Sequence, residues 1–109
     1  MAEDPRKGPG EGGKGGTALL ERPEVRQPRR YKVLLHNDDY TTQEWVVMVL
    51  EEYFHQSRPD AVRLMLQVHH TGSAVVGIYP RDVAETKVEQ VNESSRQAGY
   101  PLLCTCEPE

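Results

Sequence analysis

Cysteine and long apolar segments are scarce in this chain of 109 residues. Its two cysteines, Cys104 and Cys106, are separated by a single residue, which is not the pattern of a small secreted domain held together by disulfides. No apolar run approaches the roughly 20 residues that span a bilayer. The first residues also lack the basic-then-apolar order of a signal peptide. We therefore expect a soluble, cytoplasmic protein without a membrane partner.

Hydrophobic residues are also few, but the deficit lies in the first thirty residues. That segment holds six of the nine glycines and four of the eight prolines. A segment of this composition buries too little apolar surface to offset its conformational entropy. We predict a disordered extension over residues 1–28 and a single folded domain over residues 29–109. A domain of that size is too small to enclose a large cofactor, and we expect none.

Basic residues are scarce within the predicted domain. Residues 31–109 carry six basic and twelve acidic side chains, for a net charge of −6, whereas the first thirty carry seven and five, for +2. Binding to nucleic acid requires clustered Lys and Arg that neutralise phosphates. The one basic cluster lies at the end of the first thirty residues and comprises Arg22, Arg26, Arg29 and Arg30. We therefore expect no nucleic-acid partner. The alternative is a small nucleic-acid-binding protein that uses this basic tail.

Three strands are predicted in the domain. Residues 31–36 and 74–79 are rich in β-branched and aromatic residues and end at turn residues, and residues 102–105 form a short last strand. Three helical segments separate them, which gives the order β-α-α-β-α-β. This order predicts an α+β fold in which three helices pack on one face of a three-stranded antiparallel sheet.

The predicted helices have recognisable ends. Thr41-Thr42-Gln43-Glu44 fits a capping box, with Thr41 as the cap of a helix that reaches Phe54. The second helix begins at Ser57-Arg58-Pro59, with Pro in its first turn, and stops at Gly72. The third follows Pro80 and stops before Gly99.

Polar residues at the end of the first strand are candidates for a site. Taken alone, Asn37-Asp38-Asp39 is a turn, and His69 on the apolar face of the second helix is a core histidine. Asp39 and His69 as an acid–base pair make an enzyme the other alternative, but no nucleophile or cofactor loop accompanies them, so we expect no catalytic residues. The spacing of His69, His70 and the two cysteines does not suit zinc, and we expect no metal.

Four motifs in order along the domain resemble the ClpS family. They are YKVLLHNDDYT at 31–41, LMLQVHHTG at 64–72, DVAETKV at 82–88 and PLLCT at 101–105. Members of this bacterial family are adaptors of the N-end rule pathway. They bind proteins whose first residue is Leu, Phe, Tyr or Trp and deliver them to the hexameric unfoldase ClpA for degradation by ClpP. The resemblance implies a monomeric, non-enzymatic adaptor in the bacterial cytoplasm.

The resemblance also implies site residues. A free N-terminus is an ammonium with three donors, and the matching acceptors are Asn37, Asp39 and His69. Asp38 and Thr41 match residues at the rim that contact the peptide backbone. The pocket for the first side chain matches Gln43, Val46, Met65, Val68 and Leu102.

Two positions depart from the family pattern. Thr42 and Gln43 stand where the family has Pro and a Met that acts as a gate, which affects the preference among first residues.

On the third helix, Asp82, Glu85 and Lys87 match residues that contact the N-terminal domain of ClpA. The extension matches a segment that the family needs for delivery.

Overall fold

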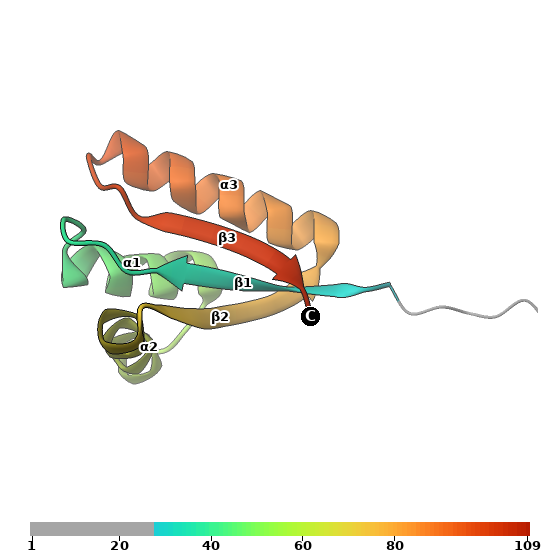
Figure 1. The fold of residues 1–109 in the computed structure, drawn as a ribbon, viewed down its shortest axis with the longest axis horizontal. Coiled ribbons are helices and arrows are strands. Elements are labelled where there is room, and N and C mark those ends of the chain that lie inside the picture. The colour runs from blue at the N-terminus through green and yellow to red at the C-terminus, as the bar shows by residue number, and fades with distance from the viewer. Residues whose placement is uncertain (1–27) are drawn as a thin grey trace, which may run out of the picture.

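The computed structural model describes residues 28–109, so the predicted extension lies almost wholly outside the described residues. The elements are β1 (Arg30–His36), α1 (Gln43–Phe54), α2 (Arg58–Thr71), β2 (Ser73–Pro80), α3 (Arg81–Gln97) and β3 (Leu103–Pro108). This order confirms the predicted α+β fold (Figure 1). In residues 28–109, no helix is long and apolar enough to cross a membrane.

The sheet has the strand order β2-β1-β3, and both pairings are antiparallel. The central strand β1 is flanked on both sides, and its inward side chains Val33 and Leu35 are fully buried. The β1–β2 register shifts between Val33 and Leu34, which pair with Gly77 and Val75, so Val76 is an extra residue on β2. Gly77 leaves room for the Tyr79 ring, since a Cβ atom at this position would lie 2.5 Å from the ring and the ring would have to move.

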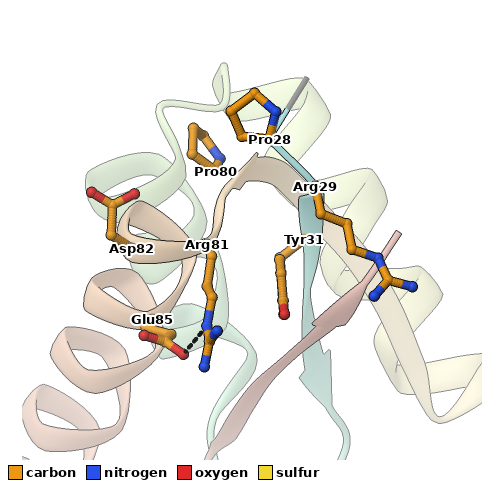
Figure 2. A pocket seen from close by; sticks show the side chains of 7 residues that line it. All are labelled: Pro28, Arg29, Tyr31, Pro80, Arg81, Asp82 and Glu85. Carbon is orange, nitrogen blue, oxygen red and sulfur yellow. Dashed lines mark hydrogen bonds and ion pairs between the residues drawn. The ribbon is translucent and has the colours of Figure 1, made fainter. Parts of the chain in front are cut away.

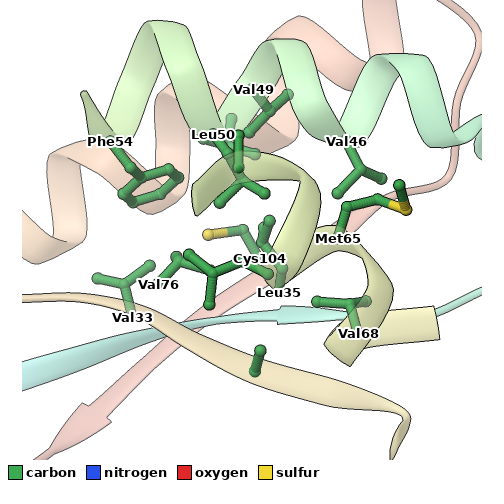
Figure 3. Packing of buried hydrophobic residues seen from close by; sticks show 14 of the residues in the cluster. Val33, Leu35, Val46, Val49, Leu50, Phe54, Met65, Val68, Val76 and Cys104 are labelled. Carbon is green, nitrogen blue, oxygen red and sulfur yellow. The ribbon is translucent and has the colours of Figure 1, made fainter. Parts of the chain in front are cut away.

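All three helices pack on one face of the sheet, as predicted. α3 lies along β3, α2 packs on β2, and α1 packs mainly on α2 (Figure 1). The core between them is mostly aliphatic, and Leu35 and Leu50 (Figure 3), with Val91, are among its most buried side chains. Each such burial stabilises the fold by roughly 1.5–3 kcal/mol. The core therefore holds the helices rigidly over the sheet.

The structure corrects two predicted boundaries. Thr41 is not the cap of α1: Thr42 is, and its side chain accepts a hydrogen bond from the Trp45 amide at 3.2 Å. The Thr41 hydroxyl is already engaged by Asp38, so the cap falls one residue later. The last strand runs from Leu103 to Pro108 rather than over 102–105, because β1 offers backbone partners along that whole length.

Candidate functional site

The loop between β1 and α1 is organised by Asp38. Its Oδ1 accepts hydrogen bonds from the amides of Tyr40 (2.8 Å) and Thr41 (2.7 Å), and its Oδ2 accepts one from the Thr41 hydroxyl (2.8 Å). Partial burial raises the pKa of the Asp38 carboxyl, but these three hydrogen bonds outweigh it and lower the pKa below its ordinary value. Asp38 is thus an ionised carboxylate whose acceptors serve the loop itself.

A backbone contact joins this loop to the end of α2. The Asn37 amide donates to the carbonyl oxygen of Gly72 at 2.9 Å. Gly72 ends α2 with a φ of 98°, a left-handed conformation that favours glycine. The contact brings the loop to the last turn of α2, which carries His69.

Asn37, Asp39 and His69 converge on a cavity of about 200 Å³. All three side chains are exposed, and within residues 28–109 none of them has a hydrogen bond to another side chain or to the backbone. His69 is therefore not the core histidine that its helix face suggested. The other lining residues are Asp38, Thr41, Gln43, Val46, Met65 and Val68. One small cavity thus combines unpaired polar groups with apolar ones.

The apolar part of the cavity is continuous with the core. Met65 lies between Val46 and Val68, and all three are buried members of the core cluster (Figure 3). Because they are held by packing on the sheet, this floor exists before any ligand arrives. A cavity of this size is smaller than the roughly 300–1,000 Å³ of sites for drug-sized ligands, and it suits a single side chain.

The remaining residues expected at the pocket differ in position. Gln43 is exposed in the first turn of α1 and lines the cavity. Leu102 lies just before β3, is buried in the core cluster and is not among the residues that line the cavity. All nine residues that line the cavity are among the site residues that the resemblance implied.

A larger cavity of about 610 Å³ lies where the chain enters β1 and α3 begins. Figure 2 shows Tyr31 beside Arg81, whose guanidinium lies 5.9 Å from the Tyr31 ring centroid and 3.1 Å from the Glu85 carboxylate. Asp82 and Glu85, the expected unfoldase contacts, line this cavity and are exposed. They lie on a surface separate from the smaller cavity.

Lys87 is not a free surface cation. Its Nζ donates to the carbonyl oxygen of Tyr53 at 2.8 Å and lies 5.4 Å from the Tyr79 ring centroid and 6.0 Å from that of Phe54. It therefore binds the C-terminal end of α1, where a helix favours positive charge. Lys87 also lines a cavity of about 290 Å³ together with Asp82, while its ammonium contacts the end of α1.

Asn92 has a structural role that the sequence analysis did not identify. Its amide donates to the Cys104 carbonyl at 3.0 Å and accepts from the Cys104 amide at 2.8 Å, which fastens β3 to α3. No local sequence signal marks this pair, since its members are brought together by packing.

Burial, with a smaller contribution from Cys106, raises the pKa of the Cys104 thiol to about 12, so this thiol is not a nucleophile.

The family model described as "ATP-dependent Clp protease adaptor protein ClpS" matches residues 26–105. The chain belongs to the ClpS family. A relative from Deinococcus radiodurans named "ATP-dependent Clp protease adapter protein ClpS" is 50% identical over 98 residues, which cover 90% of this chain and 87% of the relative. A relative of the same name from Caulobacter vibrioides is 48% identical over 107 residues and 98% of each chain.

A solved structure supports the same membership. The structure of Agrobacterium tumefaciens ClpS2 bound to L-phenylalaninamide is 46% identical, covers 76% of this chain and all of its own, and superposes with a TM-score of 0.74. The relatives are named as adaptors, so this ClpS chain is an adaptor of an ATP-dependent Clp protease and not an enzyme. The expected non-enzymatic role is confirmed, and the acid–base alternative is set aside.

Proposed function

We propose that this ClpS chain recognises the free first residue of proteins destined for degradation and delivers them to the unfoldase ClpA. The observation that carries the proposal is the convergence of Asn37, Asp39 and His69 on a small cavity with an apolar floor, with no hydrogen bond from their side chains to any other described residue. The first residue of a chain has matching chemistry, because its free amino group and its side chain are bonded to the same Cα atom.

The polar groups suit an ammonium ion. An N-terminal amine has a pKa of about 8, so at neutral pH it is charged and has three donors. The Asn37 amide oxygen, the Asp39 carboxylate and a neutral His69 nitrogen supply three acceptors and one negative charge. A residue inside a chain offers a single uncharged N–H, which leaves the carboxylate without its partner. The site therefore selects chain ends over internal residues.

The apolar floor suits the side chain of that residue. Burying a Leu or Phe side chain against Val46, Met65 and Val68 contributes roughly 1.5–3 kcal/mol. Each charge-assisted hydrogen bond adds about 1.5–3 kcal/mol. After the costs of association, these terms allow a dissociation constant no tighter than about 1 µM. An affinity of that order permits release, as an adaptor requires.

The ligand of the related ClpS2 structure supports this assignment. L-Phenylalaninamide has a free amino group, an aromatic side chain and an amide in place of the carboxylate. It thus has the groups of the first residue of a peptide. We carry this ligand class to the present chain and expect Leu, Phe, Tyr and Trp as first residues.

For delivery, we assign the contact with the N-terminal domain of ClpA to the start of α3. Asp82 and Glu85 are exposed there, on a surface separate from the small cavity, so substrate and unfoldase can be bound together. The adaptor acts as a monomer in the cytoplasm, with residues 29–109 as its binding domain.

Asp82→Arg is expected to weaken binding to the isolated ClpA domain at least tenfold, whereas Glu52→Arg, on the exposed surface of α1, is expected to leave this binding unchanged. Equal affinities for the two variants would contradict this docking surface.

The decisive experiment for recognition is a titration with peptides that differ only at the first residue. Leu- and Phe-initiated peptides are expected to bind, and their N-acetylated forms to lose at least tenfold in affinity, because an acetylated nitrogen has no charge and one donor. Acetylated peptides that bind within threefold of the free amines would contradict the proposal.

A further inference from the structure

Trp45 links the first turn of α1 to the far end of α3. Its indole Nε1 donates to the hydroxyl oxygen of Ser95 at 2.9 Å, across 50 positions of sequence. Its ring also packs on that of Tyr100, with the centroids 5.2 Å apart and the planes tilted by 37°. The side chain is therefore held from two directions by the C-terminal part of α3 and the turn that follows.

Ser95 is unusual among the polar residues of the domain. It is the one buried polar side chain found within residues 28–109, with an exposure of 0%. It lies on the inward stripe of α3 with Ala84 and Val91, whose side chains are apolar. Its hydroxyl has the indole as a partner, as a buried polar group requires.

The residues beside Trp45 form one wall of the small cavity. Gln43 and Val46 line it, whereas Trp45 points to α3 and does not. Because a helix turn is rigid, the direction fixed by the Trp45–Ser95 bond also fixes where the side chains of Gln43 and Val46 point. The cap at Thr42 holds only the backbone of this turn, so it does not set the distance of the turn from α3.

We infer that Ser95 is a positioning residue for substrate recognition, which acts through Trp45 to hold the α1 wall of the cavity in place. This inference rests on the proposed function, since it assigns the cavity to the first side chain of a substrate. It adds a residue outside the four family motifs, in a helix that contributes nothing to the cavity lining. Its effect falls on affinity and on the ranking of first residues, because the wall contacts the side chain and not the ammonium.

The test compares Ser95→Ala with Ser94→Ala in the full chain. Ser94 is the neighbouring half-buried serine, and in the described residues its side chain has no hydrogen bond, so it is a matched control. Labelled Leu- and Phe-initiated peptides are titrated by fluorescence anisotropy well below the unfolding temperature of each variant. Ser95→Ala is expected to weaken binding about three- to tenfold and to change the Leu-to-Phe ratio of affinities, while Ser94→Ala matches the unmodified protein.

A second variant keeps the inference testable if Ser95→Ala does not fold. Trp45→Phe keeps an aromatic ring and removes the donor, and it is expected to weaken the same peptides by a similar factor. The double variant is expected to lose no more than the weaker-binding single variant, because both changes break one bond. Affinities within 1.5-fold of the unmodified protein for either single variant, at any unfolding temperature, overturn the inference. If the unmodified protein binds neither peptide, the proposed function fails, and this inference fails with it.

Discussion

Replacing Asp39 by Asn tests how the site distinguishes a charged chain end. The substitution keeps the shape of the side chain and removes its charge. Asp39 is exposed and, among the described residues, forms no ion pair or hydrogen bond, so the folded state does not depend on it. We expect the free energy of unfolding of Asp39→Asn to stay within about 0.5 kcal/mol of the natural protein.

Binding is expected to respond strongly to the same change. A hydrogen bond to a charged group contributes about 1.5–3 kcal/mol, and the lower part of this range applies because Asp39 is open to water. That corresponds to a loss of roughly ten- to thirtyfold in affinity for a Leu-initiated peptide. The N-acetylated peptide, which has no charge to recognise, is expected to bind the two proteins equally.

Calorimetric titration and thermal unfolding together decide the outcome, with Asp38→Asn as the control. Asp38 carries the three hydrogen bonds of the loop, so its replacement is expected to lower the free energy of unfolding by about 1–3 kcal/mol as well as the affinity. The reasoning is refuted if Asp39→Asn binds the free amine within threefold of the natural protein. It is also refuted if Asp39→Asn destabilises the fold as much as Asp38→Asn does.

Four further predictions follow from the structure. Since the pKa of Asp38 is lowered in the folded state, its carboxylate stabilises the fold above the unfolded pKa of about 3.9, and this stability is lost as pH falls through the folded pKa. The free energy of unfolding, measured with denaturant, is therefore expected to fall less between pH 7 and pH 3 in Asp38→Asn than in the natural protein. Lys87→Met is expected to lower the free energy of unfolding by about 1–2 kcal/mol, against less than about 0.5 kcal/mol for Lys32→Met, whose ion pair is exposed. His55 ends α1 with a φ of 54°, so His55→Gly is expected to raise thermal stability by about 0.5–1 kcal/mol. Gln43→Met is expected to increase discrimination against Val-initiated peptides relative to Leu-initiated ones, because a thioether lies flat on apolar groups and an amide turns to water; equal ratios in the two proteins would exclude a gate at this position.

The sequence predicted the fold because its local signals agree with one another. Ser57 caps α2, Gly72 ends it, and the strand and helix patterns place their apolar residues on one side of each element. The end of β3 was missed because Cys106-Glu107-Pro108 has no strand pattern of its own. Those residues are extended because β1 supplies their partners, and Pro108 is tolerated at the edge of the sheet.

Residue patterns alone predicted a turn at Asn37-Asp38-Asp39 and a core histidine at His69. Only the resemblance to the ClpS family grouped Asn37, Asp39 and His69 in one site, and the structure places them at one cavity. The internal contacts of Lys87 and the Trp45–Ser95 bond join residues 34 and 50 positions apart, so they depend on how the helices pack. A pattern of residue types does not show that the Lys87 ammonium contacts the end of a neighbouring helix.

Adjacent carboxylates in the β1–α1 loop have opposite tasks, and this arrangement explains how a small domain can keep a site ready for a charged ligand. The Asp38 carboxylate accepts three hydrogen bonds from within the loop, so the loop is held in shape without a ligand. Asp39 is left to solvent together with Asn37 and His69, and exposed polar groups cost little because water satisfies them. In the proposed function, the ammonium of a first residue replaces that water. The gain is therefore modest for each contact, and it is largest for a ligand that offers all three donors and an apolar side chain at once.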